Sequence, residues 1–133
     1  MGVGGKAVIL VVDDEPSVVN TLAMVLEQAG YSVLTANTGQ EAIDIVAGVA
    51  VDLALVDVDM PRMNGISLAR EIRKRLAECK IILISGAPGA SELIDAALAE
   101  GVEFDVVAKP VPPADLLEQI SGLLRGGNHP RAA

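Results

Sequence analysis

The chain has 133 residues, of which 51% are hydrophobic and only 2% aromatic, so it is long enough to bury a core and that core must be aliphatic. Ten basic and eighteen acidic side chains give a net charge of −8, which disfavours direct binding to nucleic acid or to an anionic membrane surface. The single cysteine, Cys79, excludes an internal disulfide and a four-cysteine zinc site.

The two ends of the chain show no targeting signal. Residues 1–6 lack the charged-then-apolar pattern of a secretory signal and are expected to form a flexible leader. No apolar run approaches the roughly 18 residues that a membrane helix needs. Residues 126–133 are expected to form a disordered tail. We therefore expect one cytoplasmic domain over residues 7–125, with no output domain in this chain.

The first part of the chain alternates between strand and helix patterns. Val8–Val12 is a continuous, mostly β-branched run of strand length, and Pro16 then opens a stretch whose apolar residues share one helical face. Residues 31–36 alternate between apolar and polar side chains, which predicts a strand near the edge of a sheet. A turn at 37–39 then leads into a helix predicted over 40–47.

The rest of the chain repeats this alternation. Continuous aliphatic runs predict strands at 52–56, 80–84 and 105–108. Amphipathic stretches predict helices at 66–78, 91–100 and 113–124.

Five predicted strands that alternate with five predicted helices indicate an α/β domain with a doubly wound, five-stranded parallel sheet. The continuous apolar character of most of these strands agrees, because such a sheet is covered by helices on both faces. In this kind of fold the ligand site lies beyond the carboxyl ends of the strands, where the strand order reverses.

Charged or hydroxyl side chains follow four of the five predicted strands. The first strand ends in Asp13 and Asp14, the third in Asp57, the fourth in Ser85 and the fifth in Lys109. The second strand, which is expected at the edge, ends in neutral residues. Taken singly, each side chain has a plain explanation as a helix cap, a turn residue or a solvated lysine. Together they predict one polar rim.

The residue types indicate what this rim can do. Three crowded carboxylates need a cation, and a small set of oxygen ligands suits Mg²⁺. Lys109 would add a fixed positive charge, and Ser85 would add a hydrogen-bond donor. A carboxylate in such surroundings is equipped to attack phosphorus, so Asp57 would become an acyl phosphate.

Four motifs at these strand ends resemble those of one family. They are VVDDE (11–15), LVDVDMPRMNG (55–65), LISGA (83–87) and AKP (108–110). In this order and at these separations they resemble the receiver domain of two-component response regulators, over roughly residues 7–125. The resemblance implies the flavodoxin-like fold of CheY, with strand order 2-1-3-4-5 and five helices on both faces of the sheet.

The resemblance implies a set of metal ligands. Asp57 would be the phospho-acceptor and would also contact the metal. Asp13 and Asp14 would form the acid pair, in which Asp14 binds Mg²⁺ directly and Asp13 largely through water. Asp59 stands where the family uses a backbone carbonyl as a metal ligand.

The resemblance also implies the function. Ser85 would be the switch hydroxyl and Lys109 the lysine that contacts the phosphoryl group. The chain would be a signalling switch that accepts a phosphoryl group from a histidine kinase or a histidine phosphotransfer protein and slowly loses it by hydrolysis. Because this chemistry acts on the chain itself, we do not expect a turnover enzyme. Many receivers dimerise through the fourth helix, fifth strand and fifth helix, so a homodimer is an open alternative.

Two positions raise questions within this pattern. The family usually has Tyr or Phe where this chain has Val106, and Phe104 is the only nearby aromatic residue. We hypothesise that movement of Ser85 is transmitted by a repacked loop and fourth helix, without a rotating ring. Asp59 is acidic where the family varies, so its carboxylate either acts near the phosphoryl group or is a solvated loop group.

Three other functions compete with this interpretation. A degenerate receiver would act only as a binding module, which the intact set of Asp14, Asp57, Ser85 and Lys109 argues against. The sequence DVD at 57–59 resembles the nucleophile motif of haloacid-dehalogenase-type phosphatases, but that motif normally closes the first strand. A nucleotide-binding flavodoxin-like protein would need a phosphate loop after its first strand, and none is present.

Overall fold

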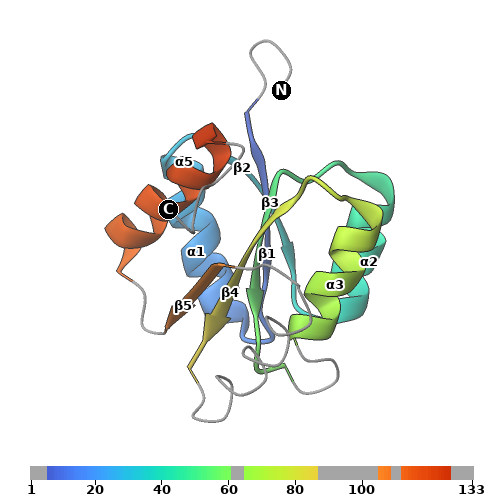
Figure 1. Ribbon diagram of the computed structural model, residues 1–133. Helices are drawn as coiled ribbons and strands as arrows, with labels where there is room; N and C mark the ends of the chain where they lie inside the picture. Colours follow the sequence, from blue (N-terminus) through green and yellow to red (C-terminus); the bar gives the residue numbers. More distant parts are fainter. Residues whose placement is uncertain (1–5, 61–64, 87–104, 109–111, 127–133) are drawn as a thin grey trace.

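A parallel β-sheet between two layers of helices makes up the described part of the chain (Figure 1). The computed structural model describes residues 6–60, 65–86, 105–108 and 112–126. The strands are β1 (Val8–Val12), β2 (Ser32–Ala36), β3 (Leu53–Asp57), β4 (Lys80–Ser85) and β5 (Asp105–Ala108). The helices are α1 (Pro16–Gln28), α2 (Gly39–Gly48), α3 (Gly65–Arg75) and α5 (Pro113–Gly126).

The strands lie in the order β2-β1-β3-β4-β5, and every neighbouring pair is parallel. This confirms the predicted doubly wound α/β fold and places β2 at an edge, as its alternating sequence predicted. The chain runs outward from β1 to β2 and then returns across β1 to β3. The strand order therefore reverses at β1 and β3, whose carboxyl ends lie toward the lower edge of the sheet in Figure 1.

Some predicted segments fall outside the described residues. These are the helix at 91–100, residues 1–5 of the leader and residues 127–133 of the tail. The tail was predicted to begin at Gly126, but that residue is the last of α5. None of the helices within the described ranges has the length and apolar character of a membrane span.

Helix α3 ends at Arg75, three residues before the predicted end at Glu78. The Arg73 Nε–H donates to the Cys79 carbonyl at 2.9 Å. The Cys79 N–H in turn donates to the Leu76 carbonyl at 3.0 Å. These bonds give backbone groups partners in a turn, so the chain leaves the helix early and enters β4.

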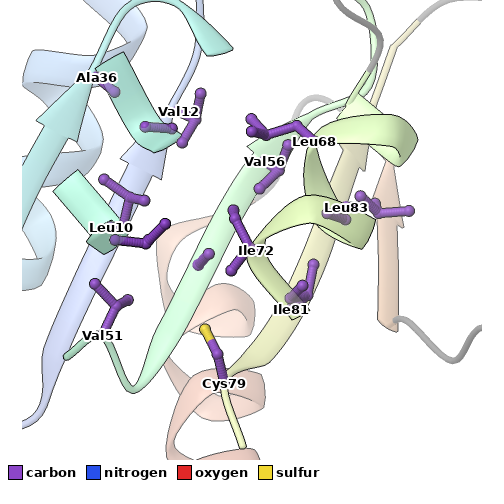
Figure 2. Close-up of a cluster of buried hydrophobic side chains, with 14 of the residues drawn as sticks. Leu10, Val12, Ala36, Val51, Val56, Leu68, Ile72, Cys79, Ile81 and Leu83 are labelled. Atoms are coloured by element: carbon purple, nitrogen blue, oxygen red, sulfur yellow. The ribbon is translucent and has the colours of Figure 1, made fainter. Parts of the chain in front are cut away.

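Two aliphatic clusters, one on each face of the sheet, hold the layers together. Successive side chains of a strand point to opposite faces, so neighbouring residues of one strand join different clusters. Val56 and Leu83 belong to the cluster that packs against α3 (Figure 2). Leu55 and Ile84 belong to the cluster that includes Leu116 of α5. The central strands are thus buried on both sides, as their continuous apolar sequences predicted.

Cys79 is buried in the α3-side cluster (Figure 2). Burial is the main cause that raises the pKa of its thiol to about 12, and the nearby Asp52 carboxylate adds to the effect. A thiol that stays protonated at neutral pH is a poor nucleophile. Cys79 is therefore a core residue.

Candidate functional site

The register of β1 and β3 brings two aspartates to the same place at the carboxyl edge of the sheet. Val12 lies opposite Val56 in the parallel ladder. One residue further along each strand stand Asp13 and Asp57, so the same register sets these two side by side. Two positions earlier on the same strands, Val11 and Leu55 join the cluster that includes Leu116 of α5. Because side chains alternate between the two faces, Asp13 and Asp57 continue that face of the sheet.

Three carboxylates meet at this edge. One carboxylate oxygen from each of Asp13, Asp14 and Asp57 lies within 4.8 Å of the others. Asp13 is 1% and Asp57 2% exposed, whereas Asp14 is the most accessible of the three. Burying two carboxylates beside a third is unfavourable unless a cation or hydrogen bonds offset their charge. The predicted meeting of these three side chains is confirmed.

The three carboxylates fit a magnesium ion. Mg²⁺ takes oxygen ligands at about 2.0–2.1 Å, so two oxygens bound to one ion lie no more than about 4.2 Å apart. The oxygens of the cluster lie within 4.8 Å of one another, so they converge on a space of the size that one ion and its bound waters occupy. The oxygen-only donor set also matches the preference of this ion.

Local hydrogen bonds fix two of these carboxylates. Asp13 Oδ1 accepts the N–H of Glu15 at 3.0 Å. Asp57 Oδ1 accepts the N–H of Asp59 at 3.1 Å. In both cases an aspartate bonds the backbone two residues on, which is the usual asparagine or aspartate turn. Each carboxylate is therefore held by the loop that directly follows it.

The Asp59 carboxylate lies apart from this cluster. In the described part of the chain, the group of converging carboxylates includes Asp13, Asp14 and Asp57 but not Asp59. Instead Asp59 Oδ2 accepts the N–H of Gly86 at 3.3 Å. Its carboxylate thus links the loop after β3 to the residue that follows Ser85. The proposed use of its backbone carbonyl as a metal ligand stays a prediction.

Ser85 is the last residue of β4 and is half-buried. Its neighbour Ile84 lies opposite Asp57 in the ladder, so Ser85 stands one residue further along the sheet than Asp57. Ser85 itself lies opposite Ala108, the last residue of β5. Lys109 follows Ala108 in the chain and lies outside the described residues. The register therefore brings the end of β5, which precedes Lys109, next to Ser85.

Gly65 packs directly against the backbone of Asp57. It begins α3, and its N–H donates to the Val58 carbonyl at 3.0 Å. A β-carbon at this position would lie 2.8 Å from Val58 Cα and 2.9 Å from the Asp57 carbonyl carbon, and it would overlap the Asp57 carbonyl oxygen. Only glycine lets the start of α3 pack directly against the backbone of Asp57.

Asn37 is a residue near the site that sequence reasoning placed only in a turn. Its side-chain amide donates to the carbonyl of Asp13 at 3.1 Å. Val12 lies opposite Ala36 in the β1–β2 ladder, so the residue after Ala36 comes beside Asp13. That register is the signal that identifies Asn37, and it becomes visible only once the strand pairing is known.

Comparison with known sequences identifies relatives of this chain. The family model "Response regulator receiver domain" matches residues 9–121. The chain is 36% identical to the response regulator MprA of Mycolicibacterium vanbaalenii over 88% of this chain and 50% of that protein. It is 33% identical to the alkaline phosphatase synthesis transcriptional regulatory protein PhoP of Bacillus subtilis, over 88% of this chain and 48% of that protein. The chain thus spans about half the length of these curated relatives.

Solved structures give the same result. The CheY-like receiver domain protein from Methanospirillum hungatei is 30% identical, with a TM-score of 0.84 over 92% of this chain and 97% of that chain. The response regulator TrrA from Thermotoga maritima, in complex with Mg²⁺ and BeF, is 33% identical, with a TM-score of 0.76 over 89% of this chain and 99% of that chain. With its fold, its cluster of carboxylates and these relatives, the chain belongs to the family of response regulator receiver domains.

Proposed function

We propose that this chain is a phosphorylation-dependent switch that accepts a phosphoryl group on Asp57 from a histidine kinase or a histidine phosphotransfer protein. Membership of the receiver family assigns the chain to two-component signalling. The observation that carries the finer proposal is the meeting of Asp13 and Asp14 with the buried carboxylate of Asp57 at the point where the strand order reverses.

The cation that this proposal needs is Mg²⁺. Asp13, Asp14 and Asp57 would hold it together with the backbone carbonyl of Asp59, and Asp13 would act largely through water. When bound, the ion would offset the charge of the clustered carboxylates and of the incoming phosphoryl oxygens. The complex of the similar TrrA with Mg²⁺ and BeF supports this choice of ion.

The proposed transfer is a displacement at phosphorus. A carboxylate oxygen of Asp57 attacks the phosphorus of a phosphohistidine, an O–P bond forms, and the P–N bond breaks with its electron pair returning to the donor's imidazole. The Asp59 N–H, 3.1 Å from Asp57 Oδ1, orients the attacking carboxylate. Ser85 would donate a hydrogen bond to a phosphoryl oxygen, and Lys109 would contribute its positive charge.

The switch would begin where Ser85 and Gly86 meet the loop of the acceptor. Ser85 would turn toward the phosphoryl group, and the Asp59 carboxylate already contacts the next residue, Gly86. Val106, in the place of the family's usual aromatic ring, is 40% exposed on β5. The contact of Asp59 with Gly86 and the valine at position 106 support transmission through the loop after β4 without a rotating ring, and the part of the fourth helix stays a prediction.

A homodimer through the fourth helix, β5 and α5 is a second part of the proposal. In the sheet of the described residues β5 is an edge strand, and an edge strand is able to pair with a second copy of the chain. Gln119 of α5 donates to Asp105 Oδ2 of β5 at 3.2 Å, which ties these two elements into one surface. The apolar side chain of Val106 is exposed on the same strand.

Labelling with acetyl phosphate tests the proposed function. With Mg²⁺ the protein should gain one phosphoryl group per chain, and peptide mapping should place it on Asp57. Chelation of Mg²⁺ should prevent the reaction. Repeated turnover of a phosphate ester would instead support a phosphohydrolase. Failure to label with any small donor would support a receiver that acts only as a binding module.

A further inference from the structure

The loop between β2 and α2 runs directly beside the acid pair. The β1–β2 ladder continues past its last pair, because the Asp13 N–H donates to the Ala36 carbonyl at 3.2 Å. The residue after Ala36 is Asn37, which is half-buried. Register alone therefore brings this loop to the point where the chain turns from β1 into Asp13 and Asp14.

Asn37 holds the peptide group that joins the two acidic residues. Its side-chain amide donates to the Asp13 carbonyl at 3.1 Å. That carbonyl belongs to the planar peptide group between Asp13 and Asp14, so fixing its oxygen fixes the direction in which the chain continues to Asp14. On its other side, Asp13 Oδ1 accepts the Glu15 N–H at 3.0 Å. The acid pair is thus held from two directions.

Asn37 is itself anchored to α2. Its backbone N–H donates to Glu41 Oε1 at 2.8 Å. Thr38 Oγ1 accepts the Glu41 N–H at 3.1 Å and caps the helix. Asn37 therefore stands between a capped helix terminus and the acid pair. Its backbone N–H bonds to the helix and its side chain bonds to Asp13.

We propose that Asn37 is a positioning residue that sets the geometry of Asp13 and Asp14 for a divalent cation, an inference that rests on the proposed Mg²⁺ site. A side chain without an amide donor would leave the Asp13 carbonyl without this hydrogen bond. The peptide between the two aspartates could then rotate, and Asp14 would have to be ordered at the moment of cation binding.

The neighbouring residue provides a matched control. The Thr38 side chain accepts a hydrogen bond from the Glu41 N–H of α2 and makes none with Asp13 among the described residues. Asn37→Ala should weaken Mg²⁺ binding, measured by calorimetric titration, by about tenfold, the lower end of what the loss of an outer-shell partner costs. Thr38→Ala should lower the melting temperature and leave the Mg²⁺ affinity unchanged.

Labelling by acetyl phosphate separates positioning from general damage. In Asn37→Ala the Mg²⁺ concentration that gives half the maximal rate should rise by the same factor, whereas the rate at saturating Mg²⁺ should approach that of the wild type. Asn37→Leu fills a similar volume without a donor and should behave likewise. A folded variant of Asn37 with wild-type Mg²⁺ affinity would overturn the inference.

A measurement on the wild type covers the case in which both variants fail to fold. The NMR signals of the Asn37 side-chain amide should shift with Mg²⁺ at the same concentration as the Asp14 backbone amide. If Asp14 shifts and the Asn37 amide does not, this inference is wrong and the proposed site stands. If the wild type binds no Mg²⁺ at all, both are wrong.

Discussion

Strand β3 has an aspartate at each end, and the two differ in their exposure and in the groups that surround them. Asp52, just before the strand, is exposed, and its carboxylate accepts the Val8 N–H at 2.7 Å. Its own N–H donates to the Val8 carbonyl at 2.9 Å, and its carbonyl accepts the Lys80 N–H at 3.0 Å. Asp52 therefore fastens β1, β3 and β4 together at their amino ends.

Asp57, at the other end of the strand, is buried beside two more carboxylates. The contrast shows that an aspartate next to a buried strand is not by itself a sign of chemistry. What distinguishes Asp57 is its position at the carboxyl edge of the sheet, where the strand order reverses. The carboxylates of Asp13 and Asp14 lie at the same place. One end of β3 is structural, and the other end is proposed to react.

Substitution of the two aspartates should give the largest difference. Asp57→Asn should abolish labelling by acetyl phosphate, because an amide oxygen is a poor nucleophile toward phosphorus. Asp52→Ala should label at the wild-type rate and should lose about 0.5–1.5 kcal/mol of unfolding free energy, the usual cost of one hydrogen bond. Mass spectrometry and urea unfolding measure these effects. Slow labelling in Asp52→Ala would contradict the division between the two ends.

Gly65 gives the next largest effect. Gly65→Ala forces a β-carbon into the backbone of Asp57, so it should cost about 1–3 kcal/mol and slow the labelling of Asp57. Gly122→Ala in α5 is the control, because a β-carbon there meets nothing within 4 Å. That change should stabilise the helix by up to about 1 kcal/mol and leave labelling unchanged. Equal behaviour of the two variants in urea unfolding would argue against the close packing at Gly65.

The pH dependence of stability tests the burial of Cys79, which directly precedes β4 near the amino end of β3. The pKa of its thiol is about 12 in the native protein, above its ordinary value of 9.0. The unfolded chain therefore loses this proton first as pH rises, so the contribution of Cys79 to stability is complete below pH 9 and declines between pH 9 and about 12. The unfolding free energy of Cys79→Ala should fall less steeply over this range than that of the wild type. An identical slope in the two proteins would contradict the burial argument.

Asp59 gives the smallest expected effect. Asp59→Ala removes the acceptor of the Gly86 N–H, and because this bond is exposed and 3.3 Å long it should cost less than about 1 kcal/mol. Hydrogen exchange at the Gly86 amide should be faster in that variant. Asp59→Asn keeps an acceptor oxygen and should retain wild-type exchange. Faster exchange in both variants would show that charge, and not the hydrogen bond, protects this amide.

The sequence predicted the fold and the three-carboxylate cluster because both depend on simple patterns. Aliphatic runs of strand length mark the sheet, and parallel strands bring their carboxyl ends to one edge. Asp13 and Asp57 each stand directly after an apolar run, so their meeting follows once β1 and β3 are neighbours. The apolar and alternating residues of 31–36 likewise identified the edge strand.

Other features depend on individual side chains and could not be predicted this way. The bond from Asn37 to Asp13 needs the β1–β2 register and one particular side-chain orientation. The tight contact of Gly65 depends on the angle at which α3 leaves the loop. The early end of α3 goes with the hydrogen bonds of Arg73 and Cys79 in the turn that follows, which the apolar pattern does not report. The periodicity of apolar residues shows which face of a helix or strand is buried. It does not show the contacts that single side chains make with the next element.

An NMR titration with Mg²⁺ tests the central claim most directly, because it observes both ends of β3 in one experiment. The backbone amides of Asp13, Asp14 and Asp57 should shift together with a single half-saturation point, and the amide of Asp52 should not move. Shifts at Asp52 equal to those of the cluster, or no shifts at the cluster, would contradict the account.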